Sequence, residues 1–183
     1  MTPRPLRVPP QPPEAWSEGT RSVLGSAPQK GRLHLPLVVA WHPTLLAPYM
    51  AWATSVARHG VLSPRDNALL ALRTALRCGS EFEWGVHVAH RQLTPDEVAR
   101  VAEGPDAGWG PRDRALLRAA DELHDRSAVG DGTWDALTGM FPTEALLEIV
   151  FVVGHYTMLS MVANSAGVPP EPDWPELGRA DAV

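Results

Sequence analysis

The sequence predicts an all-α protein. Apolar residues recur at helical spacing through most of the chain, and helix-start and helix-stop residues border the periodic segments. No segment shows the sustained alternation, bounded by an Asn-Gly or Asp-Gly turn, that marks a β-hairpin. Helices are expected over residues 14–24, 43–59, 64–77, 81–91, 95–103, 112–126, 133–140 and 143–165.

The helix starts follow from local chemistry. Ser63 offers a capping hydroxyl directly before Pro64 and an early carboxylate at Asp66, which suits the free amides and the positive end of a helix. The segment 94–97, Thr-Pro-Asp-Glu, repeats this pattern. The segment 80–83, Ser-Glu-Phe-Glu, has the spacing of a capping box, in which Ser80 and Glu83 would each satisfy a backbone amide.

The composition is typical of one folded domain. Of the 183 residues, 44% are hydrophobic and 20% are charged, which excludes wholesale disorder and simple repeats. The formal net charge of −5 has the wrong sign for a dedicated nucleic-acid surface, so no nucleic-acid partner is expected.

Cysteine content and hydropathy predict a cytoplasmic protein without a membrane partner. Cys78 is the single cysteine, so no internal disulfide can form, and the first residues hold no apolar stretch of the signal-peptide kind. The most apolar run, residues 146–162, contains Glu148 and His155, which are costly in hydrocarbon. We therefore expect this run to be a buried core helix.

Proline content separates the two ends of the chain from the helical domain between them. Residues 1–13 hold six of the 19 prolines, which excludes a regular helix and favours an extended arm. The expected organisation is a proline-rich basic arm with a short helix over 1–35, a helical domain over 36–168, and a proline-rich tail over 169–183.

One face of the helix expected over 81–91 carries most of the chemistry. At about 100° per residue, Ser80, Glu83, His87, His90 and Arg91 share an arc of roughly 100°. Glu83 and His87 are i and i+4 neighbours, so the carboxylate could orient the imidazole and raise its basicity. Two histidines with Trp84 beside them suit a cleft better than a solvated face, which is the alternative interpretation.

A metal site is a further alternative for this face. Glu83, His87 and His90 have i, i+4, i+7 spacing, so three ligands from one helix are conceivable. The chain contains neither an H-E-x-x-H motif nor a repeated E-x-x-H pattern, and we expect no metal and no other cofactor.

Several segments together resemble a known family. They are the residues 62–66, 78–87, 93–98 and 154–156, together with Asn164, and the run Glu-Phe-Glu-Trp-x-x-His at 81–87 is the most specific. Over residues 36–170 the chain resembles the carboxymuconolactone decarboxylase family of the alkylhydroperoxidase-like superfamily. The resemblance implies an alkylhydroperoxidase-like helical bundle, association into trimers or hexamers, and active sites near subunit boundaries.

The same resemblance separates two branches of chemistry. The peroxidase branch carries a C-x-x-C-x-x-x-H motif, and with His87 as its histidine the cysteine positions become Ser80 and Glu83. The resemblance thus implies that the dithiol redox pair is absent. The decarboxylase branch keeps an E-x-x-x-H pair, which Glu83 and His87 match. This chain is longer than the usual decarboxylase, and substrate-binding residues outside the motif are not clearly matched.

The expected function is a cofactor-independent enzyme that acts on a small carbonyl or lactone compound by proton transfer, with decarboxylation, isomerisation or cyclisation. His87 would be the general base or acid, and Glu83 would fix its tautomer and stabilise its charged form. The substrate pocket is expected to include Ser80, Trp84, His90, His155, Tyr156 and Arg65.

Two other functions remain open at this point. One is a non-catalytic homo-oligomer that binds a small molecule or regulates a partner through the same pocket. The other is a peroxidase-like protein that uses Cys78, although a lone thiol lacks the resolving partner that peroxide turnover needs.

Overall fold

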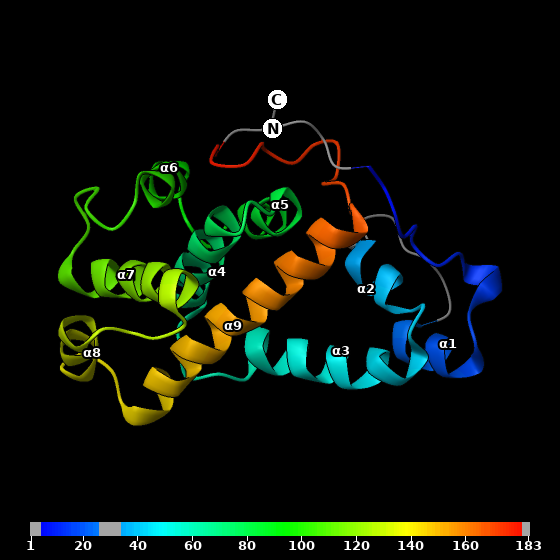
Figure 1. Cartoon of the computed structure of the whole chain (residues 1–183), viewed down its shortest axis with the longest axis horizontal. Helices are drawn as coiled ribbons and strands as arrows, with labels where there is room; N and C mark the ends of the chain where they lie inside the picture. The colour runs from blue at the N-terminus through cyan, green and yellow to red at the C-terminus, as the bar shows by residue number, and fades with distance from the viewer. Residues whose placement is uncertain (1–4, 26–33, 181–183) are drawn as a thin grey trace.

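All regular secondary structure in the described part of the chain is helical. The computed structural model describes residues 5–25 and 34–180, and within these residues it contains helices and no strand (Figure 1). A short 3₁₀-helix at Pro13–Ala15 is followed by α1 (Glu18–Leu24), α2 (His34–Val39), α3 (Pro43–Arg58), α4 (Pro64–Arg77), α5 (Glu81–Ala89), α6 (Pro95–Glu103), α7 (Pro111–Arg126), α8 (Asp131–Thr138) and α9 (Thr143–Ala166). The all-α prediction is confirmed, and every helix expected from α3 to α9 is present within about two residues of its expected ends.

Helix α4 is the centre of the fold. It packs against α5, α6, α7 and α9, and its residues Leu69, Leu70 and Leu72 are completely buried. Its start follows the predicted chemistry, because the Ser63 hydroxyl accepts a hydrogen bond from the Asp66 backbone N–H at 3.0 Å.

Helix α2 was not predicted. The run His-Leu-Pro-Leu-Val-Val at 34–39 is short and β-branched, and Pro36 argues against a helix interior. In the structure Pro36 lies in the first turn, where its missing N–H removes no intrahelical hydrogen bond. The N-terminal segment also contacts this helix, because the Gln11 backbone N–H donates to the Leu37 carbonyl at 2.9 Å.

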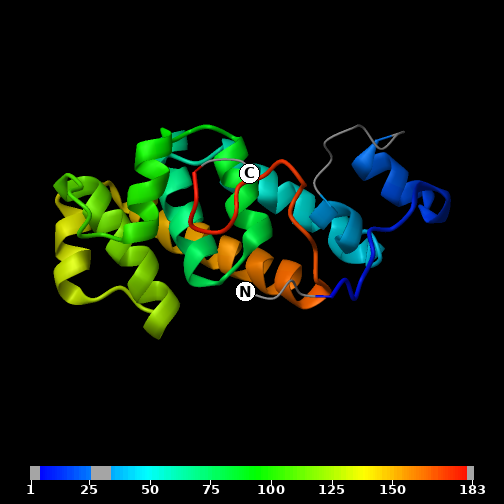
Figure 2. The same cartoon turned by 90° about the horizontal axis from the view of Figure 1, so that it is seen from above.

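The two proline-rich segments both pack against the helices of this chain. In the described part of the N-terminal segment, the backbone N–H groups of Arg7 and Val8 donate to the Ala166 carbonyl at the end of α9. Positions 1–4 and 26–33 of the arm expected over 1–35 lie outside the described residues. The C-terminal tail, residues 169–180 in the structure, crosses the outer side of α5 (Figure 2).

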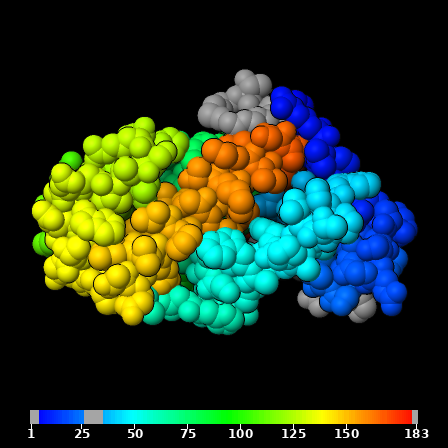
Figure 3. Space-filling view, turned by 60° about the horizontal axis from the view of Figure 1, so that its bottom comes forward, coloured from blue at the N-terminus to red at the C-terminus, as the bar shows by residue number. Residues whose placement is uncertain are grey.

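Helix α9 has two different faces. One face packs in the core against α3, α4, α5, α7 and α8, as expected for residues 146–162. The other face lies at the surface beside α3 (Figure 3). Large apolar side chains are exposed there. The exposed large apolar residues on these two helices are Leu45, Trp52, Leu147, Val150, Phe151, Met158 and Met161, and we call this set the apolar face. By length and hydropathy α9 could also span a membrane, but half of its most apolar window is buried inside the fold.

A buried ion pair fastens α4 to α7. The Arg73 guanidinium donates to both carboxylate oxygens of Asp121, at 2.7 and 2.9 Å, and to the Val101 carbonyl at 2.9 Å. Arg73 is 8% exposed, so this charge depends on its partners for solvation.

We expect Asp121→Asn to destabilise the fold by about 3 kcal/mol, because it leaves the Arg73 charge buried without its carboxylate. The matched control is Asp106→Asn, whose pair with Arg118 is exposed and should contribute less than about 1 kcal/mol. Urea unfolding of both variants measures the difference. Equal losses would show that the Arg73 pair has no special structural role.

Candidate active site

The residues that precede helix α5 set its direction. The chain turns from α4 into α5 through Gly79, whose φ of 58° lies in the left-handed region that favours glycine. The Ser80 hydroxyl then accepts from the Glu83 backbone N–H at 3.4 Å, so Ser80 is the N-cap as predicted.

The capping box expected at Ser80 is only half formed. The Ser80 backbone N–H donates to the Ala75 carbonyl at 2.9 Å, so it does not need the Glu83 carboxylate. By contrast, Thr94 and Glu97 at the start of α6 form both bonds of a capping box. The Glu83 side chain is therefore not used as a cap and is free for another role.

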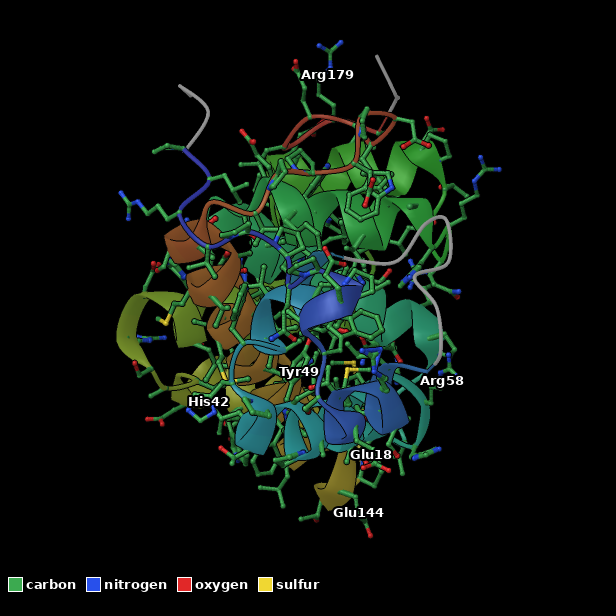
Figure 4. The ribbon with its side chains drawn as sticks, turned by 90° about the vertical axis from the view of Figure 1, so that its right-hand side faces the viewer. Glu18, His42, Tyr49, Arg58, Glu144 and Arg179 are labelled. Carbon is green, nitrogen blue, oxygen red and sulfur yellow. The ribbon has the colours of Figure 1, made fainter. Side chains whose placement is uncertain are left out.

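Glu83 and His87 face one small cavity. It has a volume of about 130 Å³ and lies where α2, α3, α5 and α9 meet. The residues that line it are Leu35, Pro36, Tyr49, Phe82, Glu83, Val86, His87, His90, Tyr156 and Leu159. Figure 4 shows Tyr49 well inside the outline of the molecule, whereas Arg58 and Glu144 lie at its edge.

The acid and the imidazole are both buried. Glu83 is 3% exposed and His87 is 8% exposed, and His87 Nε2 lies 4.0 Å from Glu83 Oε2. This separation is longer than a hydrogen bond. The His87 ring stands edge-on to the Tyr156 ring, with centroids 4.5 Å apart, and lies 5.7 Å from the His90 ring.

Burial moves the two pKa values in opposite directions. It raises the pKa of Glu83 to about 8, because a carboxylate loses hydration in the cavity. It lowers the pKa of His87 to about 3, with smaller contributions from the neighbouring His90 and His155. The sequence predicted a more basic His87, and the structure reverses this because desolvation outweighs a carboxyl group 4.0 Å away. At neutral pH the pair is a protonated acid beside a neutral base.

The other titratable groups around the cavity also favour their neutral forms. Burial raises the pKa of both Tyr49 and Tyr156, and it lowers the pKa of His90. The Tyr156 hydroxyl donates to Asn67 Oδ1 at 3.3 Å, which fixes the ring beside His87. The cavity thus holds hydrogen-bonding groups with little fixed charge.

Some predicted pocket residues lie beside the cavity without lining it. The His155 Nδ1 atom accepts from Trp52 Nε1 at 3.1 Å, and burial lowers the pKa of His155 to about 4. Trp84 is completely buried on the other side of α5, where its Nε1 donates to the Arg179 carbonyl at 2.9 Å. Ser80 acts through its cap. His90 and Tyr156, by contrast, line the cavity.

The structure contradicts the role expected for Arg65. It was expected to bind a substrate carboxylate, but its guanidinium donates to Glu97 at 2.7 Å and to Asp113 at 2.8 and 2.9 Å. These bonds tie α4 to α6 and α7, and they occupy the planar donor fork that a carboxylate would need. Arg65 does not line the cavity.

Cys78 also lies elsewhere. Its Sγ is 3.6 Å from His124 Nδ1, at the end of α4 next to α7, and it does not line the cavity. Burial raises the pKa of the Cys78 thiol, which disfavours the thiolate that peroxide chemistry requires. Asn164, part of the family resemblance, donates to the Cys78 carbonyl at 2.9 Å and so has a structural role here.

Sequence reasoning missed the wall opposite α5. Tyr49, Leu35 and Pro36 come from helices far from the motif, and no local pattern marks them as partners of Glu83.

Across residues 5–25 and 34–180, no group of three or more histidine, cysteine, aspartate or glutamate side chains is arranged to hold a metal ion.

Solved structures define the class of the fold. An uncharacterized peroxidase-related protein from Ralstonia eutropha JMP134, with an alkylhydroperoxidase AhpD core, aligns with a TM-score of 0.76 at 20% identity, over 92% of this chain and 94% of that one. A variant of the debrominase Bmp8, in complex with 2,3,4-tribromopyrrole, aligns with a TM-score of 0.72 at 15% identity, over 92% of each chain. A peroxidase-related protein from Silicibacter sp. TM1040 aligns with a TM-score of 0.68 at 15% identity, over 98% of this chain and 99% of that one. The fold is therefore alkylhydroperoxidase-like.

Part of the chain matches a family model by sequence. Residues 43–122, which run from α3 into α7, match the carboxymuconolactone decarboxylase family. This match confirms the family resemblance, over a shorter range than the residues 36–170 expected. It includes Glu83 and His87 but ends before α9 and the tail. Among curated proteins, none matches the chain significantly by sequence.

The raised pKa of Glu83 predicts a pH-dependent stability. The unfolded chain releases this proton near pH 4.5 and the folded chain near pH 8, so stability is lost as pH rises through that interval. The loss should reach a few kcal/mol, on the order of 1.4 kcal/mol for each pKa unit.

Glu83→Gln should remove this alkaline loss, so that the variant gains stability relative to wild type between about pH 5 and pH 9. Melting temperatures across that range test the expectation. Glu144→Gln, at an exposed glutamate at the start of α9, is the control and should follow wild type. Parallel curves for wild type and Glu83→Gln would show that Glu83 is ionised in the folded protein.

Proposed function

We propose that this protein is a cofactor-independent enzyme that moves a proton on a small carbonyl or lactone compound. Isomerisation, cyclisation or decarboxylation are the outcomes that such a step supports. The proposal depends on one observation above all: Glu83 and His87, both buried, face the same cavity, where burial favours the protonated acid and the neutral imidazole.

The pair supplies a base and an acid in one place. Neutral His87 can accept a proton from a carbon next to a carbonyl group. The electron pair left behind moves onto the carbonyl oxygen, and protonated Glu83 can donate a hydrogen bond to that oxygen as its charge develops. Return of the proton from the imidazolium to another carbon completes an isomerisation without any further reagent.

The cavity volume limits the compound. A cavity of about 130 Å³ is close to the roughly 150 Å³ of an engineered apolar cavity in another protein that binds benzene. A ring of five or six atoms therefore fits, with its polar group toward Glu83 and His87. An unsaturated butyrolactone has this size and carries a carbonyl group, so it serves as the probe.

We expect the protein to convert a β,γ-unsaturated butyrolactone into its conjugated isomer, which ultraviolet absorbance can follow. His87→Ala should lower the rate by about 10²- to 10⁴-fold, the usual contribution of general acid or base catalysis. Glu83→Gln should also be severe, because an amide is a weaker proton donor than a carboxylic acid. His124→Ala, on α7 away from the cavity, is the control.

The double variant decides whether the two residues act as a unit. Its rate should be little lower than that of His87→Ala, since neither residue works without the other. Fully additive losses would contradict the paired mechanism. Normal turnover by the Glu83→Gln variant would show that the Glu83 carboxyl group has no part in catalysis. Binding of the lactone without conversion would favour a non-catalytic binding protein.

We also propose that the protein is a homo-oligomer, a trimer or a hexamer. The apolar face supports this, because its seven large side chains on α3 and α9 are each at least 37% exposed. Exposed apolar side chains gathered on two neighbouring helices are typical of an interface. Trp52 and Phe151 in this face pack edge-on with centroids 5.6 Å apart, and Trp52 also bonds His155, so the face adjoins the candidate site.

Phe151→Glu combined with Met161→Glu should dissociate the assembly, because burying two carboxylates at an interface costs several kcal/mol. Light scattering should then give the mass of the 19.8 kDa monomer. Ala136→Glu, exposed on α8, adds a charge outside the apolar face and should leave the assembly intact. A monomeric wild type at micromolar concentration would overturn the proposal.

A further inference from the structure

The C-terminal tail is anchored to α5 at Gly85. The Trp174 ring lies against the Gly85 backbone so closely that a Cβ atom at this position would overlap the indole. The same ring packs on Phe82, with centroids 5.6 Å apart and planes tilted by 57°. Glycine is required here by the close approach of the tail.

A second anchor lies further along the tail. The Trp84 indole donates to the Arg179 carbonyl at 2.9 Å, and Pro175 between the two anchors is buried. The Arg179 side chain itself points away from the body (Figure 4). The tail therefore covers the side of α5 that faces away from α4 and α9 (Figures 1 and 2).

Phe82 connects the tail to the cavity. One side of its ring meets Trp174, and Phe82 also lines the cavity that holds Glu83 and His87. Helix α5 has nine residues, and an isolated helix of that length is marginal in water. Its position therefore depends on packing from both sides.

We propose that Trp174 is a positioning residue for the active site, which presses α5 against α4 and α9 so that Glu83 and His87 stay in a water-poor cavity. The inference rests on the proposed function of this pair. Trp174 contributes no group to the cavity lining. It also lies outside the family match of residues 43–122, so its packing against α5 involves a part of the chain that the family model does not cover.

The electrostatic surroundings of the pair allow a direct readout. The titratable groups that face Glu83 and His87 from the packed elements are Tyr49 from α3, His155 and Tyr156 from α9, and His90 from the end of α5. The tail adds no charged side chain to the cavity lining. Loss of the tail should act through hydration of the cavity, because no charge is removed from it.

The experiment compares Trp174→Ala, Trp174→Phe and Trp134→Ala in the full chain. Trp134, partly exposed on α8, is the control for loss of an indole. Nuclear magnetic resonance titration of the Glu83 carboxyl and the His87 ring should show both pKa values in Trp174→Ala shifted toward their usual values by about one unit or more. Trp174→Phe should restore most of the wild-type behaviour, because it keeps a ring on Phe82, and Trp134→Ala should match wild type.

A backbone variant tests the same contact from the other side. Gly85→Ala should displace Trp174 and produce the same pKa shifts, whereas Gly132→Ala on α8, where a Cβ meets open space, should not. If Trp174→Ala is poorly folded, Gly85→Ala alone decides the test, and unchanged pKa values in it overturn the inference.

Unchanged pKa values in Trp174→Ala and Gly85→Ala would overturn the inference, whether or not the tail moves. That outcome would leave the proposed function standing, because the proposed function is tested by turnover in the Glu83 and His87 variants. Conversely, shifted pKa values in a protein with no lactone isomerase activity would support the positioning role and count against the reaction.

Discussion

The burial of two titratable side chains on one short helix is the constraint on which the site depends. Taking Glu83 and His87 out of water costs free energy, and their separation of 4.0 Å does not recover it through a hydrogen bond. The protein limits this cost by keeping both groups neutral. A protonated acid beside a neutral imidazole is the form in which both can exchange a proton with a bound compound.

The rest of the fold can be understood as the enclosure of this helix. Helices α4 and α9 pack behind it, α2 and α3 close the opposite wall of the cavity, and the tail covers its outer side. The charged groups that hold the frame together are kept away from the cavity. Arg65 and Arg73 both direct their guanidinium groups to carboxylates of neighbouring helices.

The candidate site differs in its side chains from the dithiol motif of the peroxidase branch that the resemblance includes. The single cysteine lies outside the cavity, and burial raises its pKa. The two positions where the family resemblance places cysteines hold the Ser80 cap and the Glu83 acid. This chain thus has a hydroxyl and a carboxyl group at the two positions where the resemblance places cysteines.

The sequence by itself predicted the helices from α3 to α9, the family resemblance and the helix face that carries Glu83 and His87. Caps such as Ser63 and Thr94 act through neighbours three residues away, and the pairing of Glu83 with His87 needs only one helical turn. Only the tertiary structure decided the rest. Three features depend on contacts between segments that are distant in the sequence. They are the ion pairs of Arg65, the cavity wall formed by Tyr49 and α2, and the packing of Trp174 on Gly85. The protonation state of the pair was decided there as well, because burial sets it and local spacing does not.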